Sequence, residues 1–198
     1  MARRLKASAE RRLGPRVRAL PPLILVTDPD RTPDPVASAQ RLPPGSAVIY
    51  RSFGAGDAEE VGRRLAAVAR SRGLILLVGA DAGLARRIGA HGVHLPERLG
   101  HRACALRSAW PSALITVAAH SRWAVRRAER LGGDAVLLSS VFHSESPSAG
   151  RPLGRARFAS IARSAHLPVY ALGGVDMKNA PELLGSGAVG IAAVSALT

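Results

Sequence analysis

Two apolar segments near the end of the chain each run into small residues that could hold an anion. Gly173 and Gly174 follow the segment 169–172, and Ser195 follows the segment 190–194. Glycine lets a backbone come close to an anion, so that its N–H groups can donate to phosphate oxygens. In barrels built from βα units, the loops after the seventh and eighth strands commonly hold a phosphate. We therefore interpret four residues as candidate phosphate contacts: Gly173, Gly174, Val194 and Ser195.

Two histidines are the candidate groups for proton transfer, because an imidazole changes its charge close to neutral pH. His120 ends an apolar segment, whereas His143 lies in the longest loop, 140–154, together with Ser140 and Ser144. We take both histidines as candidate catalytic residues and both serines as candidate phosphate-binding residues. Each histidine has a structural alternative, since His143 could face solvent and His120 could cap the helix that follows it.

Three further residues lie on or beside apolar segments. Arg51 is a candidate catalytic residue, because a guanidinium can grip a phosphate or a carboxylate with two hydrogen bonds. His94 lies inside an apolar segment, and we interpret it as a packed residue. Asp28 precedes a proline, and we interpret it as a turn former rather than a catalytic group.

Short apolar segments alternate with longer helical patterns, which is typical of parallel strands joined by crossover helices. We predict eight strands, at 23–27, 47–51, 74–78, 92–95, 114–118, 135–139, 169–172 and 190–194. Apolar residues recur at helical spacing in 58–72, 83–88, 102–110, 123–130, 155–165 and 180–186, and the first crossover, 35–42, is short. The pattern predicts an α/β fold, a (β/α)8 TIM barrel. An open doubly wound sheet is the alternative, but no G-x-G-x-x-G follows the first strand.

The two ends of the chain affect how such a barrel closes. The sequence stops at Thr198, so we expect a truncated C-terminal end that lacks the last helix. Residues 1–20 form a basic N-terminal segment, predicted to be helical over 2–13, and residues 21–198 form a single barrel domain. Either this segment or a partner subunit could cover the surface that the missing last helix leaves open, so a homodimer is a further expectation.

The formal charge of +14 raises the question of a nucleic-acid partner. Two observations argue against one: the arginines are spread over every predicted helix except 180–186, and aromatic residues make up only 4% of the chain. The densest basic cluster comprises Arg3, Arg4, Lys6, Arg11, Arg12, Arg16 and Arg18. It could be a polyanion-binding arm, but we prefer an amphipathic helix that closes one end of the barrel.

The cysteine and hydropathy patterns indicate the compartment. Cys104 is the only cysteine, which excludes an intramolecular disulfide and a thiolate metal cluster. We therefore expect a reducing, cytoplasmic setting. No apolar segment approaches the length of a bilayer crossing, and prolines break the run 20–26, so the sequence indicates neither membrane insertion nor a signal peptide.

Several short motifs occur in an order that is similar to one known family. Val141-Phe142 and Pro152-Leu153-Gly154 frame the longest loop, and PVYALGGV at 168–175 and GAVGIAAVSA at 187–196 follow it. GAHGVHL at 89–95 and the pair His120-Ser121 belong to the same series. From Leu25 to the C-terminus, the chain resembles the thiamine phosphate synthase / TenI family.

This resemblance implies a (β/α)8 barrel that acts in thiamine biosynthesis. The synthase branch joins an aminopyrimidine diphosphate to a thiazole phosphate, with loss of pyrophosphate and help from Mg²⁺. The TenI branch tautomerises a thiazole carboxylate phosphate without a metal. Both branches hold a phosphate on the Gly-Gly loop and on the loop after the last strand, which in this chain are Gly173, Gly174, Val194 and Ser195.

The chain departs from the synthase pattern at the expected metal ligands. The family's Asn-Asp pair falls on Gly79-Ala80, and the next metal carboxylate falls on Leu99, so no metal ligand is predicted at the matched positions Ala80 and Leu99. Mg²⁺ needs such carboxylates. Asp81 and Glu97 lie close by in sequence, which leaves a rearranged magnesium site as an alternative.

Other matched positions have also changed. The synthase motif Gln-x-Arg-x-Lys keeps only its arginine, as Arg51, with Ile49 and Phe53 at the outer positions, and the TenI-type histidine falls on Ser140. We therefore expect a divergent synthase or TenI-like isomerase that binds a small phosphorylated heterocycle, a thiazole phosphate or thiamine phosphate. The first alternative is a catalytically inactive protein that binds a phosphate ligand. The second is a basic structural or nucleic-acid-associated protein.

Overall fold

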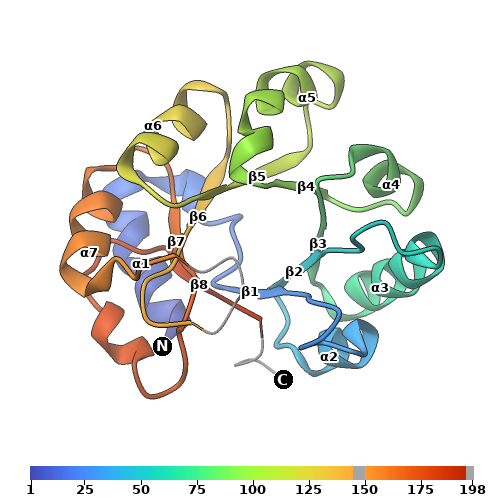
Figure 1. Cartoon of the computed structure of the whole chain (residues 1–198), viewed down its shortest axis with the longest axis horizontal. Coiled ribbons are helices and arrows are strands. Elements are labelled where there is room, and N and C mark those ends of the chain that lie inside the picture. The colour runs from blue at the N-terminus through green and yellow to red at the C-terminus, as the bar shows by residue number, and fades with distance from the viewer. Residues whose placement is uncertain (145–149, 195–198) are drawn as a thin grey trace.

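Eight parallel strands form a closed barrel in the order β1 to β8 (Figure 1). The structure is a computed structural model that describes residues 1–144 and 150–194, apart from the side chain of Arg16. The strands are β1 (Leu23–Val26), β2 (Ala47–Tyr50), β3 (Ile75–Gly79), β4 (Gly92–Leu95), β5 (Leu114–Ala119), β6 (Ala135–Leu138), β7 (Val169–Ala171) and β8 (Gly190–Ala193). The barrel closes where β8 pairs with β1, which confirms the predicted TIM barrel and excludes the open sheet.

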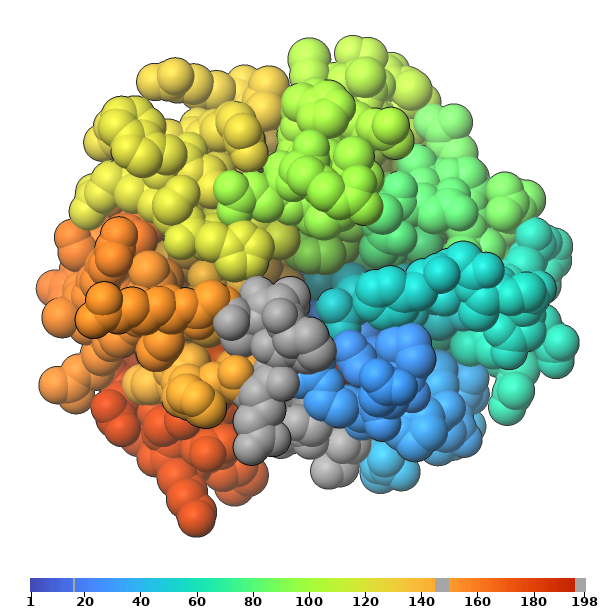
Figure 2. Space-filling view, viewed as in Figure 1, coloured from blue at the N-terminus to red at the C-terminus, as the bar shows by residue number. Residues whose placement is uncertain are grey.

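Helices surround the barrel, and their order around the rim follows the chain (Figures 1 and 2). The α-helices are α1 (Ala2–Leu13), α2 (Pro35–Arg41), α3 (Ala58–Arg72), α4 (Ala82–Arg87), α5 (Ala103–Ala109), α6 (Arg122–Arg130) and α7 (Gly154–Ser164). Three short 3-10 helices are η1 (Pro15–Val17), η2 (Glu97–Arg102) and η3 (Ala180–Leu183). None of the helices described is long and apolar enough to cross a lipid bilayer.

The core consists of two layers, because side chains alternate along each strand. Ile49 and Leu77 point into the barrel and belong to an interior cluster that also includes Tyr170. Val48 and Leu76, their neighbours in sequence, point outward and pack in the layer between strands and helices. This alternation means that a residue's parity on its strand decides whether it can reach the barrel interior.

The segment 180–186 differs from its predicted helix. It forms only the short 3-10 helix η3, which ends at Leu183. Pro181 is at the start of this turn, and Gly185 and Gly187 follow it with φ values of 73° and 89°. Left-handed glycines are typical of helix ends, so the segment turns directly into β8.

The N-terminal helix α1 lies beside β8 and α7 (Figure 1). Its buried Leu5 packs in the same outer layer as Ile191 of β8. The guanidinium of Arg12 donates to the carbonyl oxygens of Ala165 at 2.8 Å and Gly187 at 3.2 Å, after the C-terminus of α7 and before β8. We considered the N-terminal segment and a partner subunit as the element that packs on β8, and the structure favours the N-terminal helix. The division into residues 1–20 and 21–198 stays a prediction.

Candidate functional site

The carboxyl ends of the strands bring polar side chains into the mouth of the barrel. His94 on β4 lies between Gly79 of β3 and Thr116 of β5 in the strand register. Arg51, directly after β2, lies against Gly79, where an added Cβ would be 3.0 Å from the Arg51 Cγ. The missing side chain at Gly79 thus makes room for the arginine to cross this end of the barrel.

Arg51 is fixed by the first strand. Its Nε donates to the carbonyl oxygen of Thr27 at 2.6 Å, and its Nη2 donates to Asp28 Oδ2 at 2.9 Å. The phenyl ring of Phe53 lies 5.1 Å from the guanidinium carbon. Burial lowers the pKa of Arg51, while the charge of Asp28 opposes that change. In the described part of the chain only Nη1 lacks a hydrogen bond, so Arg51 offers one free end rather than the two-pronged grip expected from its type.

Asp28 forms the turn that the sequence indicated. Its Oδ1 accepts from the backbone N–H groups of Asp30 and Arg31 at 3.3 and 3.4 Å. Its Oδ2 accepts from the guanidinium groups of Arg31 and Arg51. Desolvation raises the pKa of Asp28, but the hydrogen bond and charge of Arg31, together with the charge of Arg51, outweigh it and hold this pKa below its usual range. Asp28 is therefore an ionised anchor for Arg51.

His94 is a mouth residue that sequence reasoning treated only as packed. It is buried, and its Nδ1 lies 2.9 Å from Thr116 Oγ1. Desolvation, with a smaller contribution from the charge of Arg51, lowers the pKa of His94 to about 4. Within the described residues, no hydrogen bond of His94 Nε2 is found, and His94 is not among buried groups that lack a partner. Strand parity was the available signal, because Val93 and Leu95 on either side point outward.

The loop after β7 presents two adjacent glycines in the left-handed region. Gly173 and Gly174 have φ values of 90° and 66°. A Cβ at Gly173 would lie 2.8 Å from the Cα of Ser140, and one at Gly174 would collide with the carbonyl oxygen of His143. Neither glycine N–H has a hydrogen-bond acceptor within residues 1–144 and 150–194. Only glycine fits at both positions, and both donors are free for a ligand.

The loop after β6 lies directly against these glycines. Phe142 donates its backbone N–H to the carbonyl oxygen of Gly173 at 3.0 Å, which fixes the two loops to each other. Ser140 is buried at this contact, Ser144 is half-buried, and the side chain of His143 is exposed. Four of the predicted site residues therefore lie together here: Gly173, Gly174, Ser140 and His143.

Of the loop after β8, only Val194 lies within the described residues. Val194 packs against the interior cluster, and its carbonyl oxygen accepts from Thr32 Oγ1 at 3.4 Å. Ser195, which we expected to contact phosphate, lies outside the described residues. Val194 thus connects the end of β8 to the turn after β1.

His120 is held on the other side of the rim, after β5. Its backbone N–H and its Nδ1 lie 2.9 and 2.8 Å from Glu97 Oε2. Glu97 lies in η2, and Arg127 of α6 donates to its carbonyl oxygen at 3.3 Å. The cap of α6 is Ser121, whose Oγ accepts from Ala124, so His120 is not the cap. No contact among the described residues joins His120 to Arg51 or to the glycine loop.

The residues present do not fit a magnesium ion at the positions that the resemblance suggested. Ala80 and Leu99 have no ligand atoms in their side chains. Asp81 caps α4, because its Oδ1 accepts from Leu84 N–H at 2.8 Å, and Glu97 is engaged by His120. Across the described residues, no group of three or more His, Cys, Asp and Glu side chains could hold a metal ion.

A cavity of about 850 Å³ opens beside these positions. Its lining includes Phe53, Gly79, Ala80 and Asp81, from the loops that follow β2 and β3. Phe53 and Ala80 have φ values of 50° and 64°, which are unusual for residues other than glycine. Most of this lining is small or apolar, and its charged residues are Glu59, Asp81, Arg87 and Arg102.

Comparisons with known proteins agree on one family. The family model described as thiamine monophosphate synthase matches residues 23–197. A putative thiamine-phosphate synthase of Geobacter sulfurreducens is 34% identical over 139 residues, which cover 70% of this chain and 65% of that protein. A thiamine-phosphate synthase of Alcanivorax borkumensis is 30% identical over 182 residues, with 88% and 84% coverage. The solved thiamine phosphate pyrophosphorylase of Pyrococcus furiosus has a TM-score of 0.77 and 26% identity, with 89% and 86% coverage.

Proposed function

Because this chain belongs to the thiamine monophosphate synthase family, we propose that it acts in thiamine biosynthesis on a phosphorylated thiazole. The observation that carries the proposal is the pair of unbonded N–H groups at Gly173 and Gly174, at the carboxyl end of β7. Two free donors in left-handed backbone form a concave anion site. In the proposal they bind the phosphate together with the residues that the sequence predicted for this role: Val194, Ser195, Ser140 and Ser144.

Of the two reactions of this family, we favour metal-free tautomerisation of the thiazole ring. Thiamine phosphate formation expels pyrophosphate, and the charge of that leaving group requires a divalent cation. The side chains at Ala80 and Leu99 cannot supply carboxylates, and Asp81 and Glu97 are engaged elsewhere. Tautomerisation moves one proton between two ring positions, so it needs a base, an acid and a phosphate anchor.

His143 and His120 are the proposed proton-transfer pair. The backbone of His143 touches Gly174, so its exposed imidazole begins beside the proposed phosphate. His120 pairs through Nδ1 with Glu97, which leaves Nε2 as its free ring nitrogen. One histidine removes a proton from one position of the thiazole ring, and the other donates a proton to a second position of the same ring. The substrate and the product therefore have the same composition. Arg51, through Nη1, is the proposed contact for the carboxylate of the substrate.

A non-catalytic binding protein is the second candidate. The observation in its favour is that the His143 side chain has no hydrogen-bond partner within the described residues, so nothing there orients it. Catalytic bases are usually oriented by a second group. This candidate keeps the phosphate site and predicts ligand binding without turnover.

The deciding experiment follows thiazole carboxylate phosphate by proton NMR in D₂O with EDTA present. The proposed isomerase converts one tautomer into the other and exchanges the transferred proton for deuterium. A parallel reaction contains the aminopyrimidine diphosphate, thiazole phosphate and Mg²⁺. Thiamine phosphate in that reaction would replace the isomerase proposal with synthase activity, and saturable binding without either product would favour the non-catalytic protein.

Two expectations accompany the proposal. A cytoplasmic location suits an enzyme whose single cysteine, Cys104, is exposed and free. A homodimer stays a prediction, and sedimentation of the full chain would test it.

A further inference from the structure

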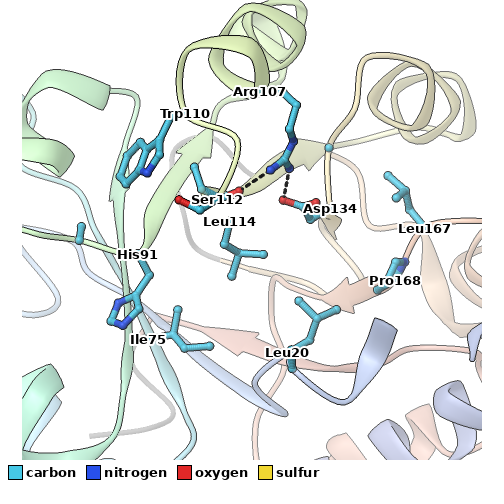
Figure 3. Close-up of a pocket in the computed structure, with 14 residues that line it drawn as sticks. Leu20, Ile75, His91, Arg107, Trp110, Ser112, Leu114, Asp134, Leu167 and Pro168 are labelled. Atoms are coloured by element: carbon cyan, nitrogen blue, oxygen red, sulfur yellow. Dashed lines mark hydrogen bonds and ion pairs between the residues drawn. The ribbon is translucent and has the colours of Figure 1, made fainter. Parts of the chain in front are cut away.

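A second cavity lies at the opposite end of the barrel from the glycine loop (Figure 3). Its volume is about 680 Å³, which lies within the range of about 300–1,000 Å³ that small-molecule sites occupy. It is formed where β3, β5 and β7 begin and where the N-terminal connection passes beneath them. Its lining includes Leu20, Ile75, His91, Arg107, Trp110, Leu114, Asp134 and Pro168.

The floor of this cavity is the lowest layer of the barrel interior. Ile75 and Leu114 are the first residues of β3 and β5, and both pack against the interior cluster while remaining only half-buried. Leu20 closes one side, and Leu167 and Pro168 close another (Figure 3). Apolar surface that a core leaves open gains free energy when a ligand covers it.

The charged groups at the edge of the cavity are already paired with each other. Arg107 donates through Nη1 to the carbonyl oxygens of Pro111 and Ala113, each at 2.8 Å, and through Nη2 to Asp134 Oδ2 at 2.5 Å. The same Oδ2 also accepts from the backbone N–H of Ile115 at 2.7 Å. The Arg107 guanidinium is thus largely occupied, and its charge is balanced by Asp134.

Two ring N–H groups at the cavity have no hydrogen-bond acceptor among the described residues: those of Trp110, which is half-buried, and His91, which is exposed. The backbone N–H of Leu76 donates to His91 Nδ1 at 3.0 Å, which makes Nδ1 the unprotonated nitrogen of the neutral ring and leaves the proton on Nε2. Trp110 is held from one side by Arg86, whose guanidinium carbon lies 5.4 Å from its ring. Within the described residues, neither His91 Nε2 nor Trp110 Nε1 has a hydrogen-bond acceptor.

We propose that this cavity is a second binding site, for a small uncharged heteroaromatic molecule that carries hydrogen-bond acceptors. In this proposal the half-buried Ile75 and Leu114 provide apolar contact for a flat ring, and Trp110 and His91 provide two N–H donors. An anion of the same shape would bind less well, because Arg107, the arginine in the cavity lining, is already paired with Asp134 and cannot replace the water that an anion would lose. The site is independent of the thiazole-phosphate proposal, since it shares none of those residues.

The two tryptophans of the chain allow a direct test, because only Trp110 lines the cavity. The probe is nicotinamide, a neutral heteroaromatic amide, and the readout is the two indole N–H resonances of the ¹⁵N-labelled protein. We expect the Trp110 resonance to shift saturably, with a dissociation constant of about 1 mM, while the Trp123 resonance stays in place. Nicotinate, the anion of matching shape, should bind at least about tenfold more weakly.

A matched pair of variants distinguishes binding in this cavity from nonspecific binding to exposed tryptophan. Trp110→Phe keeps an aromatic ring and loses the indole donor, and we expect it to weaken nicotinamide binding about tenfold, read from the backbone amides of Ser112 and Gly133. Trp123→Phe, at the exposed start of α6, should leave the affinity unchanged. Shifts that grow linearly without saturation, equal effects on both tryptophans, or equal affinity for nicotinate would each overturn the proposal.

Discussion

Glu97 holds His120 through a single carboxylate oxygen, which lies 2.9 Å from the backbone nitrogen and 2.8 Å from Nδ1 of that histidine. The pair joins η2 to the end of β5, and the guanidinium of Arg127 in α6 lies 3.7 Å from Glu97 Oε1. Since the carboxylate accepts the Nδ1 proton, it fixes one tautomer of the ring. Glu97 is therefore a positioning residue for the proposed proton transfer.

Replacing Glu97 by alanine should lower kcat about tenfold, because His120 loses the acceptor that selects its tautomer. KM should change little, since Glu97 is not part of the proposed phosphate contact. Glu97→Gln keeps an acceptor oxygen and should restore part of the rate. Glu60→Ala, at an exposed glutamate of α3, is the control. A Gln variant as slow as the alanine variant would contradict this role.

Replacing Gly174 by alanine should abolish phosphate binding, because the new Cβ would collide with the carbonyl oxygen of His143 and move the loop. Gly185→Ala is the matched control, since Gly185 also has a left-handed φ, of 73°, but has open space around its Cβ position. Both variants should lose about 1 kcal/mol of stability from backbone strain alone. Titration calorimetry with thiazole phosphate should therefore show lost binding in Gly174→Ala and unchanged binding in Gly185→Ala. Equal affinities of the two variants would contradict the assignment of the phosphate to this loop.

The strands and the glycine loop could be predicted because local sequence determines them. An apolar segment such as 135–139 has few alternatives to a buried strand, and adjacent glycines after a strand indicate a close backbone approach. The chain order of βα units then led directly to the closed barrel.

The partners of the mouth residues could not be predicted, because they come from distant parts of the sequence. Arg51 meets Asp28 across two strands, and His120 meets Glu97 across 23 positions. His94 has apolar neighbours in sequence, and from these alone its contacts with Thr116 and Arg51 in the barrel could not be predicted. Strand parity, applied to every polar residue, would have found His94.

Removing divalent metal should leave the proposed isomerase unchanged. The matched positions carry Ala80 and Leu99, and the nearest carboxylate, Asp81, caps α4. EDTA should therefore alter neither the turnover of thiazole carboxylate phosphate nor the melting temperature, and millimolar Mg²⁺ should not raise that temperature. A rise with Mg²⁺ would reveal a rearranged metal site, and Asp81→Asn would then show whether this carboxylate contributes to it.

Acid should destabilise the fold through His94 before it affects the carboxylates. Burial, with the charge of Arg51, lowers the pKa of His94 from 6.5 to about 4, so folding favours the neutral ring. A histidine whose pKa is lower in the folded than in the unfolded state contributes its full stability above the unfolded-state pKa. This contribution is lost as the pH falls from about 6.5 towards 4. The loss is on the order of 3 kcal/mol.

Urea unfolding at pH 7 and pH 4.5 measures this loss. His94→Gln should reduce the difference between the two pH values, because the variant has no imidazole to protonate, although its stability at pH 7 will be lower. The control is His166→Gln, at an exposed histidine, which should preserve the full difference. The lowered pKa of Asp28 acts in the same direction but below pH 4, because it stabilises the fold above the ordinary aspartate pKa of 3.8. An unchanged pH dependence in His94→Gln would show that His94 is not the group that titrates.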